Sequence, residues 1–531
     1  MKRTKIFFLA LMITSVANAQ SLADAIKQTT NEQFETADAS FKTLIQSQPN
    51  NGELYFYYGE NYFRNDNLDM ANKFYQKGAD VNATNPFPYV GLGKVQWLQG
   101  KQAEAKTNFF KAVTLAAGKN ATVLMKIAEL YITAETKNLP EAFNLLVQAA
   151  KLDPKNPEVY ILTGDAYLEQ NNGTKAVENY DKAAVLDPRS VKATLRLGQL
   201  YNRSRNFPLA LDFYKKASLI DSSFAPAYRE KAEIYFRAGQ YPSAVYQYKR
   251  YLQLNNNCSA RGRYAGFLNQ ARQYKESVDA AVEALKCDSS NAYLYRYKGY
   301  SQYEAGDYPN GLTTINKFFD KASKNAAIKI IGMDYEYRAK LLSKNGKDSL
   351  AIFDFKKAFE MQPEKVDLNG DIANSYVKMK KYTEAINLYK IKIEFGKPGI
   401  NDYFGLARAY YQSKDFVNAD SAASQMIRLQ PEQAVGYIWR AKANSQLDPK
   451  NEKWQAKPFY EGYLSKMKPE DIAQAQNKNN IVEAYTYIGV YYINKKDNCT
   501  AKTYFKKVQE LDAANANAKK FLDSAEAKKC P

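Results

Sequence analysis

Hydrophobic and small side chains recur in this chain with helical spacing, and the helices that they predict come in pairs. In the segment 157–188 these positions are Tyr160, Gly164, Tyr167, Ala176 and Tyr180. Intervals of three and four residues place side chains on one face of a helix. The polar segment 169–173 interrupts the pattern, and Pro188 ends it because proline has no amide donor. The pattern therefore predicts two antiparallel helices in this segment.

The same pattern returns at a step close to 34 residues along almost the whole chain. The small residue that marks each copy stands at Ala25, Gly59, Gly93, Ala128, Gly164, Gly198, Ala232, Ala265, Gly299, Ala339, Ala373, Ala407, Ala441 and Gly489. Small side chains allow two helix axes to approach within roughly 8 to 10 Å, and the aromatic residues fill the space beside the contact. A repeat of this length predicts a solenoid in which each helix pair packs on its neighbours.

Small residues at Gly164 and Ala176, with aromatic residues at Tyr167 and Tyr180, resemble the tetratricopeptide repeat family over about residues 21 to 513. The resemblance implies an all-α fold: a right-handed superhelical solenoid of about fourteen helix-turn-helix units, followed by a C-terminal capping helix. It also implies a surface that binds a partner and performs no catalysis.

Departures from the regular step indicate how the repeats are grouped. The unit around Ala265 carries Arg261-Gly262-Arg263 in its first helix and Ala281 where an aromatic residue is expected. We therefore divide the chain into N-terminal repeats at 20–260 and C-terminal repeats at 261–512, with a capping helix at 513–531. Insertions are expected near 320–325, as a longer loop, and at 447–478.

The first nineteen residues have the pattern of a secretory signal peptide. Lys2, Arg3 and Lys5 precede the apolar run Ile6 to Met12, and the small residues Ala17-Asn18-Ala19 follow. We expect cleavage after Ala19 and a periplasmic or secreted protein. No later stretch approaches the roughly 20 apolar residues that a membrane span needs.

Four cysteines follow in a chain whose predicted export permits disulfide formation. Cys258 opens the first helix of its repeat and Cys287 ends the second, and these two ends are neighbours in an antiparallel pair. Cys499 and Cys530 stand in the same relation at the last repeat and the capping helix. We therefore expect the disulfides Cys258–Cys287 and Cys499–Cys530, with four unpaired thiols as the alternative.

The candidate chemistry points away from catalysis. The chain contains no histidine, so the commonest general base and zinc ligand are missing. No phosphate-binding glycine loop or paired Cys-x-x-Cys motif is present, and nothing selects two catalytic acids among the 56 carboxylates. We expect no enzyme activity, no metal and no cofactor.

The charge is strongly positive, and loss of the three basic signal residues lowers it from +19 to +16. In the family that the chain resembles, defined first-helix positions line the inner wall. Here they give a basic, tyrosine-lined groove of Arg196, Asn202, Arg203, Arg229, Arg237, Arg263, Tyr293, Arg296, Tyr300, Tyr303 and Lys340. Arginine suits carboxylates and phosphates, and tyrosine offers rigid contact area. Ordinary solvated charge is the alternative interpretation.

The first repeats place apolar residues at the corresponding positions, namely Phe56, Tyr57, Phe63, Phe87, Val90 and Trp97. Packing between neighbouring helices explains these side chains better than contact with a ligand. The preferred function is a periplasmic or envelope scaffold that holds an extended segment of an exported or outer-membrane protein, in assembly or secretion. The alternative is salt-dependent binding of a polyanion such as an acidic glycan or nucleic acid, although export argues against nucleic acid.

Overall fold

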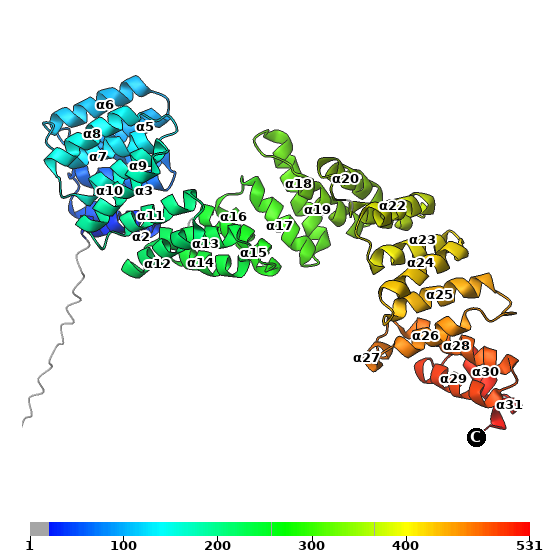
Figure 1. Ribbon diagram of the computed structural model, residues 1–531. Coiled ribbons are helices and arrows are strands. Elements are labelled where there is room, and N and C mark those ends of the chain that lie inside the picture. The colour runs from blue at the N-terminus through cyan, green and yellow to red at the C-terminus, as the bar shows by residue number, and fades with distance from the viewer. Residues whose placement is uncertain (1–20, 256–257, 366, 531) are drawn as a thin grey trace, which may run out of the picture. The chain divides into compact units, whose positions relative to one another are not determined.

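The computed structural model describes residues 21–255, 258–365 and 367–530, and this part of the chain folds into 31 helices without a strand (Figure 1). The expected signal peptide and its cleavage site lie outside the described residues. The chain divides into two compact units, one up to Tyr297 and one from Lys298. The sequence-based grouping placed this division after residue 260. No described helix is both long and apolar enough to span a bilayer.

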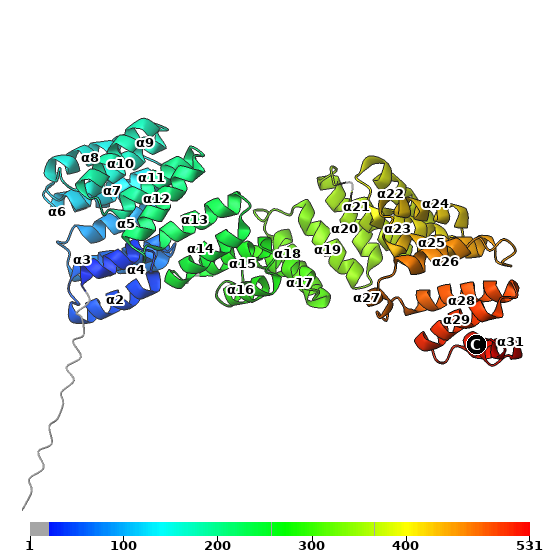
Figure 2. The same cartoon turned by 60° about the horizontal axis from the view of Figure 1, so that its bottom comes forward.

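The first unit is a stack of helix pairs in which each odd-numbered helix packs against the next (Figures 1 and 2). Its helices are α1 Leu22–Thr30, α2 Phe34–Ser47, α3 Gly52–Arg64, α4 Leu68–Val81, α5 Phe87–Leu98, α6 Gln102–Leu115, α7 Ala121–Thr133, α8 Leu139–Leu152, α9 Pro157–Glu169, α10 Gly173–Leu186, α11 Val191–Arg203, α12 Phe207–Ile220, α13 Ala225–Arg237, α14 Tyr241–Leu254, α15 Cys258–Gln270 and α16 Tyr274–Cys287. Helix α17 Ala292–Glu304 contains the boundary between the units.

The second unit repeats this arrangement. Its helices are α18 Tyr308–Lys324, α19 Gly332–Lys344, α20 Asp348–Met361, α21 Leu368–Lys378, α22 Tyr382–Phe395, α23 Ile400–Gln412, α24 Phe416–Leu429, α25 Ala434–Leu447, α26 Lys457–Lys466, α27 Pro469–Ile472, α28 Lys478–Asn494, α29 Asn498–Leu511, α30 Ala516–Leu522 and α31 Ala525–Lys528. Fourteen helix pairs in the described chain match the fourteen units expected from the sequence.

Two details of the second unit differ from the expectation. The extra residues near 320–325 do not form only a longer loop, because α18 has 17 residues where α16 has 14. The capping segment is not one helix: Asp523 ends α30, and the Ser524 side chain caps a separate short helix, α31. The segment 447–478 contains the loop after α25, helix α26, and the short helix α27 in the connection that follows.

The close approach of the paired helices explains the small marker residues. A Cβ atom added to Gly164 would lie 2.4 Å from the Tyr180 ring, and one added to Gly198 would lie 2.5 Å from the Tyr214 ring. Both tyrosines are fully buried. The aromatic side chain of the second helix therefore occupies the space that the missing side chain of the first helix leaves, as the sequence predicted.

Both expected cysteine pairs are joined in the structure. Cys258 and Cys287 have their Cα atoms 6.1 Å apart, and those of Cys499 and Cys530 are 5.2 Å apart. Each bond connects the start of one helix to the end of a neighbouring element. The first links the two helices of the irregular repeat, and the second holds the C-terminal cap on α29.

Candidate functional site

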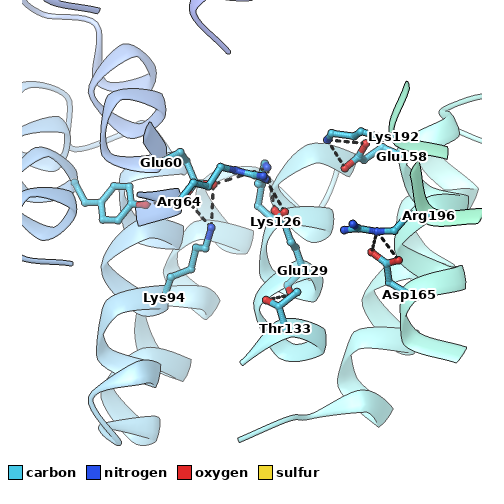
Figure 3. A network of polar contacts seen from close by, with 11 residues as sticks. Glu60, Arg64, Lys94, Lys126, Glu129, Thr133, Glu158, Asp165, Lys192 and Arg196 are labelled. Atoms are coloured by element: carbon cyan, nitrogen blue, oxygen red, sulfur yellow. Dashed lines mark hydrogen bonds and ion pairs between the residues drawn. The ribbon is translucent and has the colours of Figure 1, made fainter. Parts of the chain in front are cut away.

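Charged side chains of both signs follow one another along the inner helices of the first unit (Figure 3). We call this set the inner charge ladder, and it consists of Glu60, Arg64, Lys94, Lys126, Glu129, Glu158, Asp165, Lys192 and Arg196. They come from α3, α5, α7, α9 and α11. Several stand directly after a small marker residue, as Glu60 follows Gly59 and Lys94 follows Gly93. The repeat therefore presents them on the same face of successive helices.

The first step of the ladder joins Glu60 to Lys94 in the next repeat. Lys94 Nζ lies 2.7 and 2.9 Å from the two oxygens of Glu60, and the Tyr75 hydroxyl donates to Glu60 Oε1 at 2.6 Å. Burial raises the pKa of Glu60, but the ammonium groups of Lys94 and Lys126 outweigh it and the pKa is lowered. Glu60 is therefore held as a buried carboxylate.

The same arrangement recurs around Asp165. The Tyr180 hydroxyl donates to Asp165 Oδ1 at 2.7 Å, and Arg196 Nε donates to both oxygens of Asp165 at 2.8 and 3.0 Å. Burial dominates here and raises the pKa of Asp165 despite the Arg196 charge. Tyrosine and carboxylate are fifteen residues apart in both cases. The carboxylate of each repeat therefore accepts a hydrogen bond from a tyrosine of the same repeat and pairs with a cation of the next.

Two further clusters lie between these ends. Glu129 accepts from Arg64 at 2.7 Å and from Lys126 at 3.0 Å. Burial opposes the ionisation of Glu129, but the two cations hold its pKa well below the usual range. Lys192 Nζ donates to both oxygens of Glu158, at 2.9 and 3.1 Å. Each cluster thus joins side chains from different repeats.

The ladder borders two adjoining cavities of about 230 and 110 Å³. Both are lined by Thr30, Arg64, Glu129, Glu158, Leu162 and Lys192. Apolar side chains such as Ile26 and Met125 complete the larger one. Fixed charges of both signs beside an apolar patch can orient the main chain and side chains of an extended polypeptide, because complementary charges set its register.

Four arginines of the predicted groove form ion pairs within the first unit. The pairs are Arg196 with Asp165 at 2.8 Å, Arg203 with Glu169 at 3.4 Å, Arg229 with Glu32 at 2.5 Å and Arg263 with Glu233 at 2.8 Å. In the second unit, Lys340 pairs with Glu336 at 2.6 Å. The surface expected to be basic therefore carries both signs. The sequence-based selection omitted the carboxylates that stand opposite these cations.

The remaining predicted groove residues occupy varied surroundings. Tyr300 is only 3% exposed and donates to Asp334 at 2.6 Å, so it packs between repeats and does not line an open groove. Asn202 is half-buried beside Tyr214. The Tyr303 ring is tilted against Tyr308 and meets Tyr337 edge to face. Arg237 donates to the Glu233 carbonyl, and the Tyr293 ring lies 5.0 Å from the guanidinium of the buried Arg296.

The apolar positions of the first repeats serve packing. Phe56, Phe87, Val90 and Trp97 are buried in one hydrophobic cluster, which confirms the interpretation favoured from the sequence. Tyr57 packs against the same cluster and also lines the larger cavity.

Most of the inner charge ladder was missed at the sequence level, although a signal was present. Glu60 and Lys94 are 34 residues apart, as are Glu158 and Lys192, so opposite charges occupy equal positions in successive repeats. Such pairs meet when repeats stack in register. A search for basic residues alone finds only one partner of each pair.

Comparisons with known proteins agree with this architecture. Models described as tetratricopeptide repeat match residues 161–226 and 482–515. A yeast protein, heat shock protein STI1 of Saccharomyces cerevisiae, is 24% identical over 184 residues, or 34% of this chain. The chain spans 29% of the length of that curated relative.

Solved structures are similar as well. The C-terminal part of a TPR repeat-containing protein from Cytophaga hutchinsonii is 30% identical, with 50% of this chain and all of that chain covered and a TM-score of 0.44. The Cut9–Hcn1 hetero-tetramer of the APC/C matches at 13% identity, with 88% of this chain and 95% of that chain covered and a TM-score of 0.35.

Proposed function

We propose that this protein, which belongs to the tetratricopeptide repeat family, is a non-catalytic scaffold of the bacterial periplasm or cell envelope. It holds an extended segment of another exported or outer-membrane protein along its inner helices, in assembly or secretion. Binding of a protein partner is the general role of such repeats; the compartment, the partner and the process are our proposal.

The inner charge ladder carries the proposal. Its side chains come from the first helices of five successive pairs, and all but Lys94 and Asp165 line the two adjoining cavities. A surface with a regular step suits an extended chain, whose side chains also recur at a regular step. The ion pairs hold the charged groups in place before binding, which reduces the entropy that a partner must pay.

The charge pattern favours a protein over a polyanion. Lys192 and Arg196 face Glu158 and Asp165, so a polyanion approaching these cations also meets two carboxylates. A polypeptide with side chains of both signs matches this surface better. The signal-like sequence at the start of the chain supports an exported location, and the lack of histidine supports a non-catalytic role.

The test uses capture from envelope extract, with the mature protein immobilised and retained proteins identified by mass spectrometry. The variant Lys192→Gln/Arg196→Gln removes two inner cations. The matched control Lys151→Gln/Lys155→Gln removes two cations from exposed positions at the end of α8 and the loop that follows. We expect a discrete partner that the control retains and the inner variant loses by about tenfold.

Equal recovery of that partner by both variants would remove the inner surface from the proposal. A fractionation of intact cells tests the compartment separately, since the mature chain should appear with periplasmic or envelope markers and lack residues 1–19.

A further inference from the structure

The first helix pair contacts the seventh across nearly 200 residues of sequence. Glu32 lies in the turn between α1 and α2. Arg229 Nη1 donates to both of its carboxylate oxygens, each at 2.5 Å. The Tyr251 hydroxyl donates to the same carboxylate at 3.0 Å. Arg229 lies on α13 and Tyr251 on α14, so one acid binds both helices of the seventh pair.

A second group of contacts reinforces this one. Lys27 Nζ lies 3.0 Å from Asp221, and the Asn31 side chain donates to Asp221 at 3.2 Å and to Ser223 at 3.0 Å. Asp221 and Ser223 belong to the turn before α13. The segment 27–32 is therefore fastened to the start of the seventh pair by polar contacts at several points.

The fastened turn lies over one end of the inner charge ladder. The 110 Å³ cavity is lined by Glu32 together with the ladder residues Arg64, Glu129, Glu158, Lys192 and Arg196, and by Arg229. Its lining has four cations against three carboxylates. Arg64, Lys192 and Arg196 have their own carboxylate partners, and Arg229 also lies 3.3 Å from Glu230 through its other terminal nitrogen. Departure of this turn would therefore free one side of the Arg229 guanidinium, together with the Tyr251 hydroxyl, for another carboxylate.

We infer that the α1–α2 hairpin is an autoinhibitory latch and that Glu32 occupies a subsite for a carboxylate of the partner. An extended segment of the partner that places a carboxylate at this position displaces Glu32 from Arg229 and Tyr251. The latch rests on the proposed function, and it adds the chemistry of the segment and the regulation of its access.

The exposure of the contact suits displacement. The side chains of Arg229 and Glu32 are 31% and 21% exposed, so water and ligand can reach the pair. Partly exposed ion pairs contribute little net stability, because solvent competes for the charges. A ligand that supplies its own carboxylate therefore replaces the Glu32–Arg229 pair with an equivalent one, and the remaining cost of opening is the loss of the Lys27 and Asn31 contacts with Asp221 and Ser223. Binding of such a ligand shifts the population toward the open state.

The experiment compares wild type, Glu32→Gln, Arg229→Gln, the charge swap Glu32→Arg/Arg229→Glu, and the control Glu35→Gln. Glu35 is an exposed carboxylate three residues away, so its variant loses the same charge without touching Arg229. The probe is a fluorescein-labelled peptide of alternating aspartate and glycine, followed by anisotropy, with an asparagine–glycine peptide as reference. Hydrogen exchange of residues 22–47 reports the latch without any ligand.

We expect Glu32→Gln to bind the aspartate peptide about tenfold more tightly than wild type, because the fraction of open molecules rises. Arg229→Gln and the charge swap should lose this binding, and Glu35→Gln should behave as wild type. Exchange in residues 22–47 should accelerate in Glu32→Gln and Arg229→Gln and slow again in the charge swap, which restores an ion pair.

Faster exchange without tighter peptide binding would make the contact purely structural and overturn the carboxylate subsite. Unchanged exchange in Glu32→Gln would overturn the latch, and equal binding of both peptides would overturn the recognition of a carboxylate. If the proposed function is wrong, no partner will be captured, but hydrogen exchange of residues 22–47 will still accelerate in Glu32→Gln. Failure of the latch would leave capture from extract intact.

Discussion

Lys94 and Glu60 form an ion pair in which both side chains are almost completely buried. Their exposures are 3% and 4%, and the Nζ to Oε1 distance is 2.7 Å. The two residues occupy the same position in successive repeats, so the ion pair fixes how one helix pair stacks on the next. A buried pair of this kind contributes specificity more than net stability, because desolvation offsets most of the attraction.

Removal of the Lys94 ammonium alone should therefore destabilise the folded protein strongly. We expect Lys94→Met to lower the free energy of unfolding by about 3 kcal/mol, because it leaves the buried Glu60 carboxylate with only the more distant Lys126 ammonium, 3.8 Å away. Chemical denaturation monitored by circular dichroism measures the change. The double variant Glu60→Leu/Lys94→Met removes both charges and should recover part of the loss.

Lys77→Met is the control for this experiment, because Lys77 is an exposed lysine on α4. It should change stability by less than about 0.5 kcal/mol. A Lys94→Met variant as stable as this control would mean that the buried Glu60 carboxylate does not depend on Lys94.

The glycine markers should differ in tolerance according to the space around them. Gly164→Ala places a methyl group against the Tyr180 ring, at 2.4 Å before relaxation, and we expect a loss of about 1 to 3 kcal/mol. Gly173, at the start of α10, has nothing within 4 Å of an added Cβ. Gly173→Ala should be neutral or stabilising by up to about 1 kcal/mol. Thermal unfolding of the two variants side by side decides, and equal melting temperatures would contradict the close helix contact.

Lys231 should be a site where loss of charge stabilises the protein. Burial, followed by the nearby Lys215 charge, lowers the pKa of Lys231 to about 8. The folded state then binds this proton less tightly than the unfolded state. The destabilisation by the buried ammonium is therefore complete below pH 8, and it disappears as the pH rises toward the ordinary pKa of lysine.

We expect Lys231→Met to raise stability at pH 7 by about 1 kcal/mol, after allowance for solvent screening and for the lost contact with Ser218. The gain should shrink when unfolding is measured near pH 10. Lys249→Met, at an exposed position on α14, supplies the control. An advantage of Lys231→Met that stays constant between the two pH values would show that the ammonium is not desolvated.

The disulfide between Cys499 and Cys530 should stabilise the C-terminal cap. The two cysteines are 31 residues apart, and closure of a loop of this size is worth about 3 to 4 kcal/mol in the chain-entropy account. We expect Cys499→Ser/Cys530→Ser to speed hydrogen exchange in residues 516–530, while residues 258–287 remain protected. Intact-mass measurement should show two added hydrogens per bond on reduction. Four thiols that react in unreduced protein would refute both pairings.

Much of the fold could be predicted because its contacts are local. Gly164, Tyr167, Ala176 and Tyr180 all serve contacts within one repeat or with its neighbour, so their spacing is visible in the sequence. The cysteine pairs could be inferred for the same reason. The length of α18 and the break between α30 and α31 could not, because helix ends depend on small differences in capping and packing.

The candidate site was predicted only in part. The family register identified Arg196, Arg229 and Arg263 as inner residues, but it did not show which carboxylate each one meets. Arg196 pairs with Asp165 of the preceding repeat. A search of the inner positions for acidic as well as basic residues would have found this carboxylate. Arg229 meets Glu32, which precedes it by 197 residues in the sequence.

The sequence by itself determined the repeat, the paired helices, the small and aromatic contacts within each pair and the cysteine pairing. These follow from interactions between residues at most about one repeat apart, whose spacing is written along the chain. Only the tertiary structure decided that Glu32 closes on Arg229. A contact across 197 residues depends on the total of the small rotations between successive repeats, and the sequence of one repeat does not show that total.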